Sequence, residues 1–478
     1  MHQSPRALPA LGNQPQQTPE PSARTASGRA PHSAPAARIA LAVLLVAKLM
    51  DILDQSVALT ALPAIQESIG AGPAAVQWVT AGYSLTVAVG LITGGRLGDI
   101  HGRRKVLLVG TVVFVVASLL CGIATGPGVL IAARVLQGAG VALMIPQVLA
   151  TLHVTLDGEN RSRAFGLYGA VLSLANVMGP VLGGLLTQVD LFGLSWRPIF
   201  LINVPVGLAV VLVGTRFIPE STARTADRLD LTSMLLSAPA VVLIILPLTE
   251  GHAHHWPLWC FASLAAGLLV LGAFLRRQQL RKDDAPLVAL SLFRGKQFLR
   301  RPVRAADARP AVRAVLHDLD SVPPARVGHE PAGGRRGLRA ARSRRAGRCD
   351  GRDEDRRRFG RRLPQAGSLI ALAAMGAYGL QVSGRQADLT ILAMTVPVIL
   401  IGFGLGMVGG PLADMSLAEV PHEQAGCASG LFNTAMHLGI AFGSALTALV
   451  FFSTTGGSAD GVVNRDAFAA SCGGPAAS

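Results

Sequence analysis

Charged residues are scarce in this sequence. Asp, Glu, Lys and Arg make up 15% of its 478 residues, whereas soluble domains contain about 25%. The five cysteines are scattered without a Cys-x-x-Cys spacing, so they indicate neither a zinc site nor a redox pair. We also find no nucleophile–base pair and no phosphate-binding glycine loop. These absences argue against a soluble multidomain enzyme and a disulfide scaffold, and they predict a protein that is not an enzyme and uses no metal or cofactor.

Half of the residues are hydrophobic, and they form long apolar runs. A helix that crosses the hydrocarbon core of a bilayer needs about 20 mostly apolar residues. In lipid, such helices satisfy their own backbone hydrogen bonds. We therefore expect an all-α, polytopic membrane protein. Its eleven spanning helices are expected at about residues 39–62, 74–98, 106–125, 128–151, 165–188, 198–218, 231–250, 257–275, 366–384, 388–413 and 426–452.

The distribution of Lys and Arg in the short loops predicts the orientation. Cytosolic loops of membrane proteins are enriched in these residues. With the N-terminus inside, the outer loops before the Arg-rich region carry little beyond Arg197. The inner loops carry Arg96, Arg103, Arg104, Lys105, Arg161, Arg163, Arg216, Arg224 and Arg228. We expect a multi-pass protein of the cell (plasma) membrane, with residues 1–38 as a Pro-rich, disordered cytosolic tail that lacks a signal peptide.

The segment from Arg300 to Arg362 has a different composition. It contains 19 Arg and 8 acidic residues, so it supplies +11 of the chain's net charge of +15, and it contains no Lys or Ile. Segments that bind nucleic acid usually mix Lys with Arg and add aromatic residues. We interpret residues 300–358 as the product of a double frameshift that replaced two membrane helices. A genuine basic loop on the cytosolic face is the alternative.

Three charged residues lie in the first expected helix. Lys48, Asp51 and Asp54 follow one another at intervals of three, so they share one face. Charged groups within a membrane are costly and normally face a bundle interior or a wet cavity. Burial favours the protonated form of a carboxylate. We predict that Asp54 and Asp51 line the substrate cavity and that Asp54 carries protons. The alternative is that Lys48 and Asp51 neutralise one another and only hold helices together.

A loop rich in Gly and Arg follows the second expected helix. Glycine permits a tight turn there. Asp99 can accept hydrogen bonds from an Arg or from the N-terminus of an adjoining helix, and such a contact has to break when the protein changes shape. The alternative is an inside loop that is simply anchored by Lys and Arg. The residues of this predicted cytosolic gate are Gly95, Asp99, Gly102, Arg103 and Arg104.

Taken together, these segments resemble the major facilitator superfamily, specifically its drug:proton antiporter branch with fourteen helices. Gly95–Arg104 is similar to the family motif GxLaDrxGrr, with Ile100 where Arg is usual. Leu53–Pro63 is similar to the first-helix motif LDxTIVNVALP, with Leu59 where Asn is usual. The other matches are Arg134–Gly140 to RxxQGxG, Gly179–Gly184 to GPxxGG and Trp196–Gly207 to WRxIFxINxPxG.

This resemblance covers about residues 39–299 and 359–452. It implies the two-bundle transporter architecture, with eleven of an expected fourteen helices intact and the substrate site near the midplane between the bundles. It also implies that Arg134 takes part in proton coupling, although Arg134 could instead pin its helix to the neighbours. The resemblance further implies an antiporter motif that consists of Gly179, Pro180, Gly183 and Gly184. The alternative is that these residues only allow helices to pack closely.

The expected organisation has six parts. They are a tail (1–38), an N-terminal six-helix bundle (39–218), two linker helices with their connection (219–299), the Arg-rich segment (300–358), a partial C-terminal bundle (359–452) and a polar tail (453–478). Asp414 and Glu250 are expected to be solvated residues at helix ends. His252, His254 and His255 cluster in an outer loop, but no fourth metal ligand is evident nearby.

The expected function is proton-coupled export of amphipathic, often cationic organic compounds. The expected partners are the small-molecule substrate, protons and the lipid bilayer, with no nucleic acid, and the protein is expected to be a monomer. One alternative is an inactive, frameshifted remnant of such a transporter. A minor alternative is a nucleic-acid or lipid binder that uses the Arg-rich segment, in which case deletion of residues 300–358 should abolish a strongly salt-dependent binding.

Overall fold

The computed structural model describes residues 34–188, 193–223, 231–251, 256–280, 362–378, 391–418 and 420–454. The chain is almost entirely helical within these ranges, as its apolar runs predict. The helices are α1 (Ala34–Ile69), α2 (Pro73–His101), α3 (Arg103–Gly122), α4 (Pro127–Thr155), α5 (Gly158–Gln188), α6 (Pro198–Leu201), α7 (Asn203–Phe217), α8 (Leu231–Glu250), α9 (Leu258–Leu280), α14 (Ile391–Leu417), the short 3-10 helix η2 (His422–Gln424) and α15 (Ala425–Thr454). A further helix covers residues 362–378.

Each of the eleven expected helices corresponds to a helix in the described ranges. α6 and α7 together form the expected helix at 198–218, with a break at Ile202. α1 is longer than expected at both ends, because it begins at Ala34 and continues to Ile69. Residues 34–38, assigned above to the disordered tail, are therefore helical. The expectation of an all-α protein is confirmed.

Seven described helices are long and apolar enough to cross a membrane. They are Ala74–His101, Arg103–Gly122, Pro127–Thr155, Gly158–Leu186, Pro198–Phe217, Leu258–Gln278 and Val396–Leu417. Leu235–Leu248, within α8, is a shorter apolar segment. Apolar side chains such as Leu212, Leu268 and Phe403 are more than half exposed on these helices. Outward-facing apolar residues of this kind suit a multi-pass protein whose surroundings are lipid.

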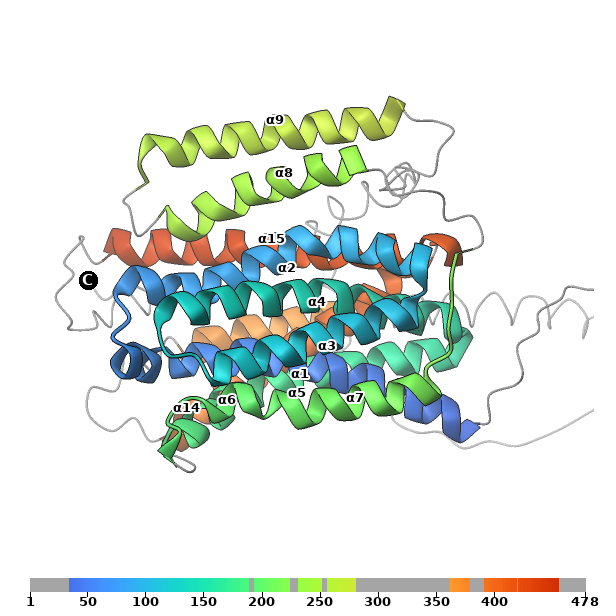
Figure 1. Ribbon diagram of the computed structural model, residues 1–478, viewed down its shortest axis with the longest axis horizontal. Helices are drawn as coiled ribbons and strands as arrows, with labels where there is room; N and C mark the ends of the chain where they lie inside the picture. Colours follow the sequence, from blue (N-terminus) through green and yellow to red (C-terminus); the bar gives the residue numbers. More distant parts are fainter. Residues whose placement is uncertain are drawn as a thin grey trace, which may run out of the picture.

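The helices lie side by side, roughly along the long axis of the molecule (Figure 1). α2 packs against α4 on one side and α15 on another, and α1 packs against α5 and α7. α14 packs against α5, while α8 pairs with α9 and contacts α2 and α15. The early and late parts of the chain are therefore joined by two main contacts, α2 with α15 and α5 with α14.

The interior is apolar but contains several charged side chains. Buried residues of α1 to α5 and α7, together with a few from α14 and α15, form the largest apolar cluster of the described residues, which includes Leu44, Phe114 and Leu149. Within the same bundle, Asp54 and Arg134 are 3% and 1% exposed. Because isolated charges are costly in such surroundings, their partners decide what this interior can do.

Some expected features lie outside the described residues. These are residues 1–33 of the tail, the Arg-rich segment 300–358, the end of the expected helix 366–384, the three outer-loop histidines and residues 455–478. The side chain of Glu250 is also outside the description. The division of the chain into six parts stays a prediction.

Candidate functional site

Asp54 lies at the centre of a polar cluster inside the N-terminal helices. Its Oδ2 accepts a hydrogen bond from Nη1 of Arg134 at 2.6 Å. Its Oδ1 accepts from the amide groups of Gln137 at 2.8 Å and Asn203 at 2.7 Å. All four side chains are buried. They come from α1, α4 and α7, so the cluster joins three helices that are distant in the sequence.

The guanidinium of Arg134 is held from several directions. Nη1 also donates to Oε1 of Gln137 at 2.6 Å, and Nε donates to the carbonyl of Val79 at 3.1 Å. The guanidinium carbon lies 4.1 Å from the ring centroid of Tyr83 and 5.6 Å from that of Phe200. These contacts compensate the cost of burying the cation.

A second buried ion pair lies one helical turn away on α1. Lys48 Nζ is 2.8 Å from Oδ2 of Asp51. Oδ1 of Asp51 accepts hydrogen bonds from Gln55 at 3.0 Å and from the hydroxyl of Tyr83 at 2.9 Å. Lys48 therefore pairs with Asp51, as the alternative in the sequence analysis assumed, whereas Asp54 pairs with Arg134. The two carboxylates share a helix but belong to different ion pairs.

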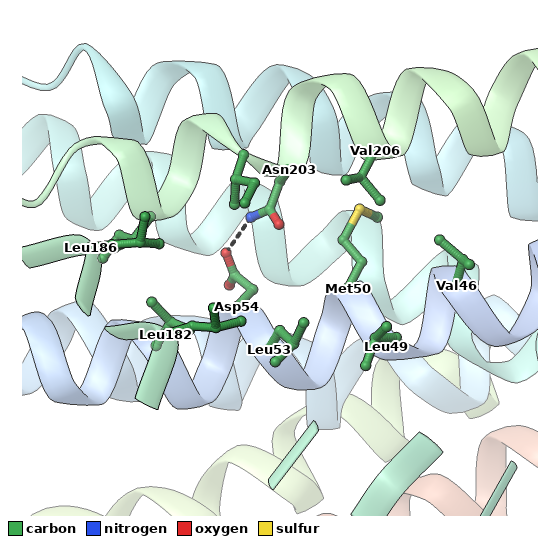
Figure 2. Close-up of a pocket in the computed structure, with 12 residues that line it drawn as sticks. Val46, Leu49, Met50, Leu53, Asp54, Leu182, Leu186, Asn203 and Val206 are labelled. Atoms are coloured by element: carbon green, nitrogen blue, oxygen red, sulfur yellow. Dashed lines mark hydrogen bonds between the residues drawn. The ribbon is translucent and has the colours of Figure 1, made fainter. Parts of the chain in front are cut away.

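A cavity of about 120 Å³ lies beside Asp54. It is lined by residues of α1, α5, α6 and α7, and Figure 2 shows the Asp54 carboxylate and the Asn203 amide meeting among these lining residues. The other residues that line it are apolar: Val46, Leu49, Met50, Leu53, Val57, Leu182, Leu186, Ile199, Ile202 and Val206. This cavity lies within the N-terminal helices, whereas the sequence led us to expect a substrate site between two bundles.

Asp99 forms a latch between α2 and α15. Its carboxylate accepts hydrogen bonds from the backbone N–H groups of Gly426 at 3.0 Å and Cys427 at 2.9 Å. These groups belong to the N-terminus of α15, where unsatisfied N–H groups and the helix dipole favour an anion. Nη2 of Arg103 lies 2.6 Å from Asp99 Oδ1 and donates to the carbonyl of His422 at 2.7 Å. We use the name Asp99 latch for these contacts.

The other residues of the predicted gate surround this latch in different ways. A Cβ atom on Gly95 would meet the backbone of Gly426, so glycine permits α2 and α15 to approach closely. Gly102 has φ +104°, a value that favours glycine, and links α2 to α3. Arg104 does not contact Asp99. Its backbone N–H and side chain instead contact Glu220, the guanidinium at 3.7 Å.

The predicted antiporter motif lies on α5 and faces α1 with two of its glycines. Cβ atoms on Gly179 and Gly183 would meet the side chains of Ser56 and Thr60, respectively. A Cβ atom on Gly184 would meet nothing within 4 Å, and Pro180 lies inside the helix. The motif therefore allows close packing of α5 against α1, directly after the part of α1 that carries Asp54.

Several polar residues of the site were not predicted. Tyr83, Gln137 and Asn203 lie in apolar stretches or within recognised motifs, and an isolated polar side chain in a membrane helix is a usable signal.

Asp414 was expected to be solvated, but its carboxylate accepts a hydrogen bond from Arg161 at 3.0 Å, which joins α14 to α5. Among the described residues, no group of three or more His, Cys, Asp or Glu is placed to hold a metal.

Known proteins resemble this chain over most of its length. The family model of the Major Facilitator Superfamily matches residues 44–293. A probable actinorhodin transporter of Streptomyces coelicolor is 34% identical over 93% of this chain and 77% of its own length. A tetracenomycin C resistance and export protein of Streptomyces glaucescens is 30% identical over 87% of this chain and 76% of its own length.

A solved structure supports the same fold. The human organic anion transporter MFSD10 superposes with a TM-score of 0.51 at 16% identity, covering 91% of this chain and 97% of that structure. At such low identity the similarity bears on the fold alone. With the family model and the two Streptomyces relatives, these findings show that the chain belongs to the major facilitator superfamily, groups with its drug and antibiotic exporters, and is a membrane transporter rather than an enzyme.

Proposed function

We propose that this protein exports amphipathic organic compounds across the cell membrane in exchange for protons, as a monomer with a cytosolic N-terminus. The names of the two Streptomyces relatives, an actinorhodin transporter and a tetracenomycin C resistance and export protein, support export of organic compounds. The observation that carries the proposal is the buried Asp54–Arg134 pair, whose aspartate lines an apolar cavity. A carboxylate in this position can bind a proton. When it is ionised, it can instead pair with a cationic substrate and with the neighbouring Arg134.

Proton uptake would disturb the Asp54 cluster because the two charges compensate each other. When Asp54 becomes neutral, Arg134 stays charged and has lost its ionic partner. An unpaired buried charge is strongly unfavourable, so the helices that carry the cluster are driven toward another arrangement. A proton arriving from outside would in this way release a cationic substrate and favour the inward-facing form.

The shape of the cavity fits part of an amphipathic substrate. Its walls are apolar apart from Asp54 and Asn203, which suits a ring or branched alkyl group that carries a polar substituent. Pockets that enclose a whole drug-sized molecule have volumes of about 300–1,000 Å³. A cavity of about 120 Å³ therefore accommodates only one portion of such a molecule in this conformation.

The Asp99 latch is proposed to close the cytosolic side. It joins α2 to the start of α15, and nearby Nε2 of His153 lies 3.0 Å from the carbonyl of Val420, which joins α4 to the segment before α15. Export requires that these contacts break so that a substrate can enter from the cytosol. Arg103 is the cation of the latch, and Arg104 supports the adjoining turn through Glu220.

Asp54→Asn tests the proposal directly. In inverted membrane vesicles we expect the variant to lose drug-dependent proton movement, because the amide cannot take up the proton. Glu159→Gln is the matched control, since Glu159 is an exposed carboxylate whose ion pair with Arg163 lies on the surface. Unchanged exchange in Asp54→Asn would remove Asp54 from the mechanism.

An inactive remnant is the second candidate function, and the Arg-rich segment favours it. The family match ends at residue 293, just before this segment begins. Expression of the chain as it stands and of a frame-repaired chain, each followed by an efflux assay, separates the two candidates. Efflux by the unrepaired chain supports the transporter, and efflux by the repaired chain alone supports the remnant.

A further inference from the structure

Tyr83 connects the two buried ion pairs of the site. Its hydroxyl donates to Asp51, the partner of Lys48, at 2.9 Å. The face of its ring lies 4.1 Å from the guanidinium carbon of Arg134, the partner of Asp54. The side chain is fully buried. A change in the charge of either carboxylate therefore acts on the same tyrosine.

Tyr83 and the Asp99 latch belong to the same helix. Asp99 follows Tyr83 by 16 positions in α2, which corresponds to about 24 Å along the helix. The helix is continuous between the two residues and contains no proline there. A displacement of α2 at Tyr83 is therefore passed on to the contacts that Asp99 makes with α15.

The contacts of Tyr83 also tie α2 to two other helices. α2 packs extensively against α4 and α15 but only slightly against α1. The hydrogen bond to Asp51 reaches across that sparse contact to α1, and the ring contact with Arg134 reaches α4. The hydrogen bond from Tyr83 to the Asp51 carboxylate therefore contributes directly to the position of α2 relative to α1.

We propose that Tyr83 is a positioning residue that transmits the charge state of Asp51 and Asp54 along α2 to the Asp99 latch. This inference rests on the proposed function, in which these carboxylates meet protons. Protonation of Asp51 weakens the hydrogen bond from Tyr83, because bonds to a charged acceptor are about twice as strong. Protonation of Asp54 frees Arg134 to strengthen its contact with the Tyr83 ring. Both events move α2 relative to its neighbours.

Other titratable groups lie near the same carboxylates, and the experiment has to distinguish their effect on the pH response from that of Asp51 and Asp54. Besides the ion-pair partners, they are Tyr168 on α5, Cys121 on α3 and His437 on α15. Of these, a histidine ordinarily titrates closest to neutral pH. A test of Tyr83 therefore includes a variant of His437.

Cys427 provides a reporter of the latch, because its buried thiol adjoins the N–H group that Asp99 binds. The full-length chain is prepared with its other four cysteines replaced by alanine. A membrane-impermeant maleimide is then applied to the cytosolic side of membrane vesicles. We expect labelling of Cys427 to accelerate when the opposite side is acidified. Tyr83→Phe should reduce this acceleration about tenfold, the equilibrium factor of one hydrogen bond to a charged group.

Two controls define what the result means. Tyr168→Phe removes a buried hydroxyl near Lys48 from α5 instead of α2, and it should keep the acceleration. His437→Gln should keep it as well. Thermal unfolding of each purified variant shows that the fold is intact. If Tyr83→Phe does not fold, Asp51→Asn weakens the same hydrogen bond from its acceptor side and should give the same loss.

Several outcomes would overturn the inference. They are an unchanged response in Tyr83→Phe, an equal loss in Tyr168→Phe, a loss in His437→Gln, or a parent protein whose labelling does not respond to pH. The efflux assay is independent of this measurement. Labelling that responds to pH through Tyr83 without any drug efflux would refute the proposed function and leave the role of Tyr83 standing.

Discussion

Asp54 and Asp51 are the same type of residue, one helical turn apart, yet their ion pairs differ in range. Asp51 finds its cation three positions away at Lys48, while Asp54 finds Arg134 on another helix. The local pair needs only the helical period. The distant pair forms because α4 packs beside α1 and α2, and because Gln137 and Asn203 complete the coordination of Asp54.

The buried pair predicts a specific pattern of stability. Arg134→Gln leaves the Asp54 carboxylate buried without its cation, so we expect a loss of about 3–5 kcal/mol in the free energy of unfolding. The double variant with Asp54→Asn removes both charges and should recover much of this loss. Thermal unfolding in detergent measures both effects.

The exposed pair of Arg163 and Glu159 serves as the control for this prediction. Its side chains are 71% and 59% exposed, so Arg163→Gln should change the free energy of unfolding by no more than about 1 kcal/mol. A double variant as unstable as the sum of its two single variants would contradict the role of charge compensation at Asp54.

At the scale of helices, glycines with the same spacing have different surroundings. Gly402, Gly406 and Gly410 of α14 face α5, where added Cβ atoms would meet the backbone or side chains of that helix. Gly439 and Gly443 of α15 have nothing within 4 Å of the same position. The spacing alone predicts close helix packing for both sets. Of the two, only the glycines of α14 pack closely against another helix.

This difference leads to a prediction with opposite signs. Gly410→Ala should destabilise the protein by about 1–3 kcal/mol, because the methyl group would meet the backbone of Phe165 and Gly169. Gly439→Ala should be neutral or stabilise it by up to about 1 kcal/mol through higher helix propensity. The unfolding midpoints of the two variants, compared with the parent, measure the contrast. Equal effects would show that α14 does not pack on α5 in this way.

At the scale of the whole molecule, the early and late helices meet at the Asp99 latch. The contact depends on a carboxylate from α2 and on the backbone N–H groups at the start of α15. Because α2 also contributes Tyr83 to the buried ion pairs, one helix borders both the proposed proton site and the proposed cytosolic closure.

Asp99→Asn should therefore open the cytosolic side. An amide presents only one acceptor oxygen and no charge to the α15 N-terminus and Arg103, so we expect labelling of Cys427 from the cytosolic side to become at least about tenfold faster at every pH. Asp157→Asn, an exposed change near the start of α5, is the matched control and should leave the rate unchanged. A slow rate in Asp99→Asn would mean that the latch does not close this side.

The sequence by itself determined the class of protein, its helices and its family. An apolar run of spanning length satisfies its backbone hydrogen bonds in lipid by forming a helix. All eleven expected helices accordingly have counterparts in the described ranges. The motifs likewise led to the transporter family, and the spacing of Lys48 and Asp51 allowed their pairing. These features depend on local periodicity, which can be read along the chain.

Only the tertiary structure decided which cation Asp54 meets, which glycines are packed, and that Tyr83 lies between the ion pairs. Helical period fixes the face on which a side chain lies but not the neighbour that this face contacts. That neighbour depends on how α1, α2, α4 and α7 pack together, with contacts between residues as far apart as Asp54 and Asn203. The packing of helices therefore converts scattered polar residues into a single site.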